Sequence, residues 1–237
     1  ALVSWIVEHA HGTPFLTGEI IHMLARTGAM EQQGTEWRLV PERLPTDVHP
    51  GNLESVLRAL LGTLPAHVRR TLSAAVVIGT EFWAGCLRDL GVEDADDALE
   101  QLVQAGIVVR NASSRYAGDR EYRLSSNLRR RVAYDMLGPR ERRAMHRKVA
   151  AWIARHGRTD LEEGLRLAHH LEMGGQPEEA ALLYARTAKA ALSVGAVEEA
   201  ERLYTHAHVL SSDPALQASV EVALRALSMR TAARFQP

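Results

Sequence analysis

The chain has 237 residues, of which 46% are hydrophobic and only 5% aromatic. This length allows two small domains, or one domain followed by an array of repeats. A formal net charge of −1 argues against a generally basic nucleic-acid binder, and the single cysteine excludes an internal disulfide framework. Alanine and leucine supply most of the apolar side chains, which favours helices over sheets.

The sequence shows no pattern of a targeting signal or of a membrane-spanning segment. No apolar run approaches the roughly 18–20 residues needed to cross a membrane. The first residues do not form a secretory signal, because Glu8 and His9 follow soon after the start. We therefore predict a cytoplasmic protein with no membrane partner. The first residue is not methionine and an amphipathic helix already begins there, so we expect the chain to belong to a longer protein.

Residues 1–50 are predicted to form a helical segment that ends in a linker. A first helix stops at Gly12-Thr13-Pro14, and helical spacing resumes over residues 15–24. A short strand at 37–40 is expected to pair with 29–31 across a polar turn. Three prolines then mark the linker.

Residues 51–138 are predicted to contain several helices and one β-hairpin. Apolar spacing and flanking Gly or Pro residues place the helices at 53–61, 65–79, 82–90, 94–105 and 128–137. Two strand-like runs, 107–109 and 121–124, flank a polar, glycine-containing turn. Helices followed by one hairpin are typical of a winged-helix domain.

Residues 139–237 are predicted to be helical throughout and to contain a repeat. The sequence Glu178-Glu179-Ala180 with Tyr184 recurs 20 positions later as Glu198-Glu199-Ala200 with Tyr204. Each copy follows a glycine that can end the preceding helix. Self-similarity at a fixed spacing indicates stacked helical repeats, although the spacing is shorter than the roughly 34 residues of a tetratricopeptide repeat. Surfaces of this kind hold partners.

No complete catalytic or metal site is predicted. A P-loop needs Gly-x-x-x-x-Gly-Lys-Ser/Thr, and neither of the two lysines, Lys148 and Lys189, stands in that pattern. Histidines that are adjacent or two apart on a helix point in different directions and do not readily share one ion. We expect His169 and His170 to lie in helix packing, and Cys86 to be a small buried apolar residue.

One stretch is strongly basic and raises the alternative of a DNA-binding winged helix. Residues 127–148 contain two acidic side chains and the following eight basic ones: Arg129, Arg130, Arg131, Arg140, Arg142, Arg143, Arg147 and Lys148. However, Leu128, Val132, Ala133 and Met136 predict a helix that packs inward, and the candidate recognition helix at 82–90 is short and nearly neutral. We do not expect direct DNA binding, and favour a solvated face or a contact with an acidic partner.

Four segments of the chain, taken in order, carry a family resemblance. The first is Gly12-Thr13-Pro14-Phe15-Leu16-x-x-Glu19-Ile20. The second is Trp37-x-Leu39 with Leu44-Pro45-x-x-Val48. The third comprises Leu64-Pro65, Ala74-Ala75-x-x-Ile78-Gly79-x-x-Phe82 and Leu102-x-x-Ala105-Gly106-Ile107. The fourth is Tyr122-Arg123-Leu124 through Arg130-x-Val132-Ala133-Tyr134, with Leu137 and His146. In this order they resemble the STAND class of signal-transduction ATPases, specifically large bacterial regulators in which an AAA-type module precedes a repeat domain. The first segment has threonine where the family has asparagine.

The resemblance implies a nucleotide contact in the longer parent protein. In that family the proline of Gly-x-Pro packs on the adenine of ADP or ATP, which assigns Gly12 and Pro14 to cofactor binding once the missing ATPase core is present. A rigid apolar ring at a helix start suits a flat base, although spacing alone fits a simple turn. A histidine that in the wider class contacts the phosphate is replaced by Ser126, which carries no positive charge. The winged helix would then sense the nucleotide more weakly, or would contact its phosphate through Arg129 or Arg130.

The predicted fold is therefore mainly α: a helical lid remnant and linker (1–50), a winged-helix domain with one small β-hairpin (51–138), and tetratricopeptide-like helical repeats (139–237). The resemblance implies a regulatory and protein-interaction segment of a larger signal-transduction ATPase, which is not itself an enzyme and holds no cofactor alone. Expected partners are its own ATPase core and a protein or small-molecule inducer on the repeats. A DNA-binding winged-helix protein and a passive repeat scaffold remain the alternatives.

Overall fold

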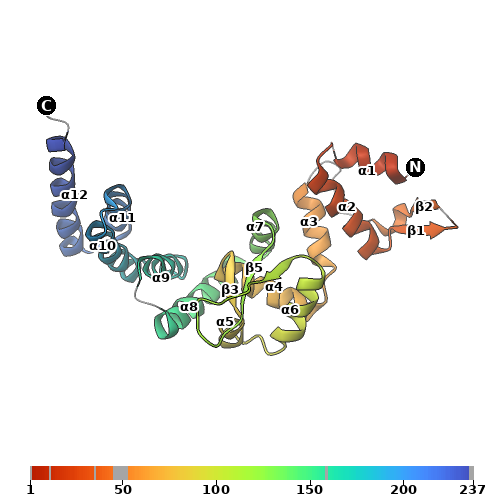
Figure 1. The fold of residues 1–237 in the computed structure, drawn as a ribbon, viewed down its shortest axis with the longest axis horizontal. Coiled ribbons are helices and arrows are strands. Elements are labelled where there is room, and N and C mark those ends of the chain that lie inside the picture. Colours follow the sequence, from red (N-terminus) through yellow and green to blue (C-terminus); the bar gives the residue numbers. More distant parts are fainter. Residues whose placement is uncertain (1, 11, 35, 45–52, 158–159, 235–237) are drawn as a thin grey trace. The chain divides into compact units, whose positions relative to one another are not determined.

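A computed structural model describes residues 2–10, 12–34, 36–44, 53–157 and 160–234, and the structural statements below concern these residues. The chain is mainly helical with small antiparallel sheets, as the sequence predicts (Figure 1). It divides into two compact units. The first comprises Ala1–Ser113 and Arg120–Leu137, and the second Ser114–Asp119 and Gly138–Pro237. The tip of the β4–β5 connection therefore belongs to the second unit.

The first unit begins with two helices and a hairpin. These elements are α1 (Leu2–Ala10), α2 (Pro14–Thr27), β1 (Met30–Gln33), β2 (Glu36–Leu39) and the short 3-10 helix η1 (Pro41–Arg43). Gly28 ends α2 in the left-handed region at φ 67°, and its N–H donates to the carbonyl of Ala25. Strands β1 and β2 pair antiparallel with Met30 opposite Leu39, so the predicted hairpin is confirmed.

The rest of the first unit combines helices with a three-stranded sheet. Its elements are α3 (Leu53–Gly62), α4 (Ala66–Ile78), β3 (Glu81–Trp83), α5 (Ala84–Asp89), α6 (Ala95–Gln104), β4 (Val108–Arg110), β5 (Glu121–Leu124) and α7 (Asn127–Asp135). The strand order is β3-β5-β4, all antiparallel.

The prediction of a single hairpin in this region is incomplete, and the predicted helix at 82–90 begins too early. Phe82 and Trp83 form strand β3, where Phe82 lies opposite Tyr122 and its ring stacks on the tyrosine at 5.7 Å. Both residues are fully buried. Pairing with a strand 38 to 42 residues away decides this conformation, and a three-residue strand is too short to show a period in the sequence.

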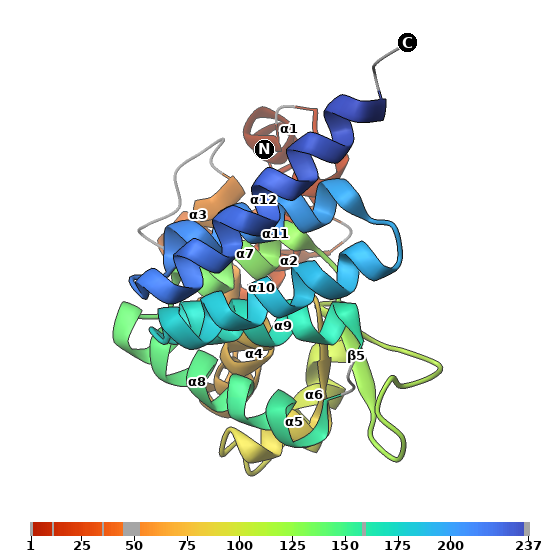
Figure 2. The same ribbon diagram turned by 90° about the vertical axis from the view of Figure 1, so that its left-hand side faces the viewer.

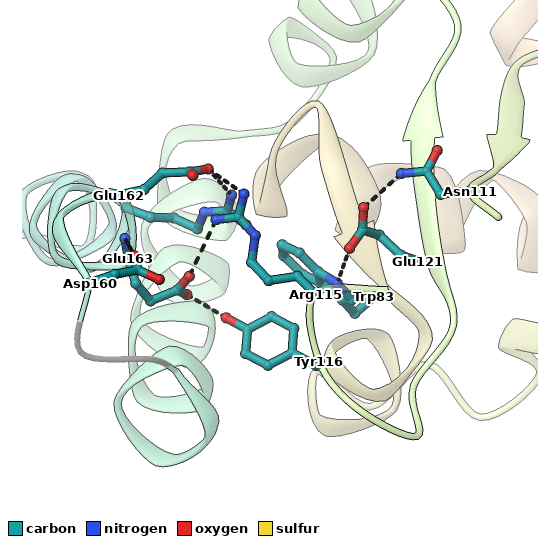
Figure 3. Close-up of polar contacts among 9 residues, drawn as sticks. Trp83, Asn111, Arg115, Tyr116, Glu121, Asp160, Glu162 and Glu163 are labelled. Carbon is teal, nitrogen blue, oxygen red and sulfur yellow. Dashed lines mark hydrogen bonds and ion pairs between the residues drawn. The ribbon is translucent and has the colours of Figure 1, made fainter. Parts of the chain in front are cut away.

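A buried polar group next to this sheet is fully satisfied. Glu121, on β5, accepts hydrogen bonds from the indole N–H of Trp83 at 2.9 Å and from the amide of Asn111 at 2.7 Å (Figure 3). Both carboxylate oxygens are thus used, as is required of an acid buried beside an apolar core. The contact links the central strand β5 to β3 and to the residue that follows β4.

The second unit is an array of five helices. They are α8 (Pro139–His156), α9 (Leu161–Met173), α10 (Pro177–Ser193), α11 (Val197–Leu210) and α12 (Pro214–Arg234), close to the predicted boundaries. Each helix contacts the next one along the chain, an arrangement visible in Figure 2. The two copies of the repeat are buried alike: Ala180 and Ala200 are fully enclosed, and Tyr184 and Tyr204 are nearly so.

Candidate functional site

The corner predicted to contact adenine lies on the surface of the first unit. Gly12 adopts φ 70°, and the N–H of Thr13 donates to the carbonyl of Ala10 at 2.9 Å, which closes the turn after α1. Pro14 occupies the first turn of α2, where its missing N–H has no cost. Gly12 and Pro14 are both exposed, so the ring of Pro14 is accessible to a flat ligand. Its contact with adenine stays a prediction.

A buried ion pair lies one turn further along α2. The guanidinium of Arg129, on α7, forms a bidentate pair with the carboxylate of Glu19; the Nε–Oε2 distance is 3.2 Å, and Nη2 donates to Oε1. Nη1 also donates to the carbonyl of Gly106 at 2.9 Å and to the hydroxyl of Ser125 at 3.2 Å. The two side chains are only 10% and 3% exposed. This pair joins α2 to α7.

The pair changes how the proposed sensor residues are interpreted. Arg129 is committed to Glu19, 110 residues earlier in the chain, and no local sequence signal connects the two. Ser126 is the N-cap of α7, and its hydroxyl accepts a hydrogen bond from the backbone N–H of Arg129 at 3.3 Å. Arg130 is half-buried, its Nε has no hydrogen-bond partner among the described residues, and burial lowers the pKa of its guanidinium.

The basic stretch is divided between the two units. Residues 129–131 belong to the first and 140–148 to the second. Arg131 pairs with Glu54 at 2.6 Å, and the Nε of Arg147 donates to the carbonyl of Gly174 at 2.6 Å near the end of α9. With Arg129 held by Glu19, several of these cations have structural partners within the protein.

The inward face predicted for α7 is only partly right. Val132 and Ala133 are buried and Leu128 is half-buried, whereas Met136 is 36% exposed. Met136 follows the last residue of α7, at its C-cap, so it has left the face that the helical spacing assigned to it.

Two histidines meet inside the second unit. The Nδ1 atoms of His146, on α8, and His170, on α9, are 2.8 Å apart, and each residue is 2% exposed. One ring donates and the other accepts, so the contact depends on the tautomers. The sequence predicts that His169 and His170 lie in helix packing. His170 is buried there, whereas His169 is exposed, with its ring 5.9 Å from that of His146 on the neighbouring helix. Among the described residues, no group of three or more side chains is arranged to hold a metal.

The tip of the β4–β5 connection carries a cluster that the sequence analysis missed (Figure 3). The hydroxyl of Tyr116 donates to the buried carboxylate of Glu163, and Arg115 pairs with Glu162 at 2.7 Å and more loosely with Glu163 at 3.8 Å. The Tyr116 ring lies edge-on to Trp152 at 4.7 Å. Burial, the hydrogen bond and the charge of Glu163 together raise the pKa of Tyr116. All these residues belong to the second unit.

Comparison with protein-family models, with curated proteins and with solved structures found no match to the chain. In the part of the chain that the structure describes, no helix has both the length and the apolar character needed to cross a membrane.

Proposed function

We propose that the chain is the regulatory and protein-interaction segment of a larger signal-transduction ATPase of the STAND class. The observation that carries the proposal is the buried Glu19–Arg129 pair. It connects the helix that begins with Gly-x-Pro to the helix that follows Ser126, the two elements to which the resemblance assigns nucleotide contacts. A ligand that moves one of these helices must move the other or break the pair.

The remaining architecture supports this assignment. Helices α4–α6 with strands β3, β5 and β4 are consistent with a winged helix. In the second unit, sequential packing and the equal burial of the two repeat copies favour tetratricopeptide-like stacking. A cavity of about 460 Å³ opens between α8, α9 and α10 and is lined by Leu161, Leu183, Arg186 and Thr187 among others. Its volume suits a small-molecule inducer.

The proposed mechanism is conformational and involves no chemistry within these residues. In the resting state the winged helix closes on the nucleotide-bound core of the parent protein, with Pro14 against the adenine. An inducer or partner on the repeats then shifts the populations of closed and open forms. Such a ligand acts only through its different affinities for the two forms.

The first test is to determine the coding sequence upstream of Ala1. We expect an in-frame P-loop there, and its absence would refute the nucleotide switch and leave a passive scaffold. If the core is present, ADP affinity is measured in the protein that includes it. Pro14→Ala is expected to weaken ADP roughly five- to tenfold, since it removes apolar contact with the base. Pro177→Ala is the matched control because Pro177 is also an exposed proline in a first helical turn; it should leave ADP affinity unchanged.

A further inference from the structure

A second cavity lies within the first unit, away from the Gly12–Pro14 corner. Its volume is about 390 Å³. Its lining includes His22, Arg26, Leu60, Leu64, Ile107 and Arg129. These residues come from the second half of α2, the end of α3 and the turn after it, the segment between α6 and β4, and α7. His22 follows Pro14 by eight residues, about 12 Å along the helix. The cavity therefore does not include the predicted adenine contact.

Among the described residues, the polar lining of this cavity has donor side chains and no acid. It contains two guanidiniums, one imidazole and the amide of Gln104, and no carboxylate is among the described lining residues. His22 and Arg26 are exposed and lie four residues apart, so they share one face of α2. The nearest acid along α2 on that side, Glu19, is committed to Arg129. Because the charge of Arg129 is balanced by Glu19, Arg26 supplies the positive charge that attracts an anion to this concavity.

Arg26 is positioned rather than freely solvated. Its Nε donates to the hydroxyl of Thr63 at 3.1 Å, and that hydroxyl donates in turn to the carbonyl of Leu60 at 2.7 Å. The Nη groups of Arg26 make no hydrogen bond to the described part of the chain. A guanidinium held through Nε with its terminal nitrogens available is suited to bidentate contact with a phosphate or carboxylate.

The floor of the cavity is apolar. Leu60, Leu64 and Ile107 line it and are each about 5% exposed or less. A ligand that complements the site would place an anionic group against Arg26 and His22 and an apolar body on these three side chains. We propose that this cavity binds a small organic anion with an apolar body. This proposal does not rest on the nucleotide-switch function.

The site is coupled to the ion pair described above. Arg129 lines the cavity while its guanidinium pairs with Glu19, so a bound anion and the Glu19 carboxylate interact with the same cation. Neutralising Glu19 therefore strengthens the attraction for a bound anion. By thermodynamic linkage, the free energy by which the Glu19 charge weakens anion binding equals the free energy by which the bound anion weakens the Glu19–Arg129 pair.

The test is calorimetric titration of the chain with phenyl phosphate, with benzyl alcohol as the neutral comparator. We expect one phenyl phosphate per chain, an affinity that falls as salt is raised, and no comparable binding of benzyl alcohol. Amide NMR shifts should appear at Gly106 and Ile107. Arg26→Gln should weaken binding about tenfold or more through loss of a charged contact, and Glu19→Gln should tighten it. Arg70→Gln, at an exposed arginine on α4, is the matched control and should change the affinity less than about twofold.

Three outcomes would overturn the proposal: no phenyl phosphate binding up to about 10 mM, equal binding by the Arg26→Gln variant, or equally tight binding of benzyl alcohol. Pro14→Ala should leave phenyl phosphate binding unchanged. Failure of this site is thereby distinguished from failure of the proposed nucleotide contact.

Discussion

Breaking the Glu19–Arg129 pair should destabilise the first unit far more than breaking an exposed pair. The two side chains are 3% and 10% exposed. Removing one partner of such a pair leaves a buried charge without compensation, which costs about 3–5 kcal/mol. Arg129→Met and Glu19→Leu are each expected to lower the free energy of unfolding by that amount.

The double variant Glu19→Leu/Arg129→Met should recover most of the loss. Both charges are then absent, and apolar side chains of similar length fill the space. The carbonyl of Gly106 and the hydroxyl of Ser125 lose a donor, but both residues are exposed, so water can replace it. We expect the double variant within about 2 kcal/mol of the parent, which, with single losses of about 3 kcal/mol or more each, corresponds to a coupling energy of at least about 4 kcal/mol.

The assay is urea unfolding followed by tryptophan fluorescence in a Trp152→Phe background. The three remaining tryptophans, Trp5, Trp37 and Trp83, all belong to the first unit, so the signal reports that unit alone.

The matched control is Arg131→Met, two residues along the same helix. Arg131 also pairs with a glutamate, but those side chains are 63% and 54% exposed, so the cost should stay below about 1 kcal/mol. If Glu19→Leu costs no more than this control, or if the two single effects simply add in the double variant, the reasoning about burial is wrong.

Two further predictions concern Gly164 and Glu178 of the second unit, the first with a control glycine in the first unit. A Cβ at Gly164 would lie 2.9 Å from the hydroxyl oxygen of Thr187, so Gly164→Ala should destabilise by about 1–3 kcal/mol. Thr187→Ala should relieve the clash, and Gly18→Ala, at a helical glycine with open space, should instead stabilise by up to about 1 kcal/mol in urea titrations. The hydroxyl of Ser211 holds the pKa of Glu178 below its ordinary value of 4.5, so its contribution to stability is present above pH 4.5 and is lost as pH falls through the lowered pKa. The difference in melting temperature between the parent and Glu178→Gln should therefore shrink in acid; a constant difference from pH 7 to about 3 would contradict this.

The sequence determined the helices of the second unit nearly to the residue. The helix boundaries depend on local backbone geometry, which can be predicted from neighbouring residues in the sequence. Examples are Pro177 at a helix start and Gly175 and Gly195, which have positive φ between helices. The N-cap role of Ser126 was not predicted from the sequence, although a serine directly before a helical run is a local signal for it.

Only the tertiary structure decided the third strand and the ion pair. Phe82 is a strand residue because β5 lies beside it, and Arg129 is paired with Glu19 because folding brings α2 against α7. The backbone hydrogen bonds of a helix join residues four positions apart, so a helix can be predicted from residues that are close together in the sequence. A sheet edge or a buried salt bridge has its partner tens of residues away, and only folding brings the two together.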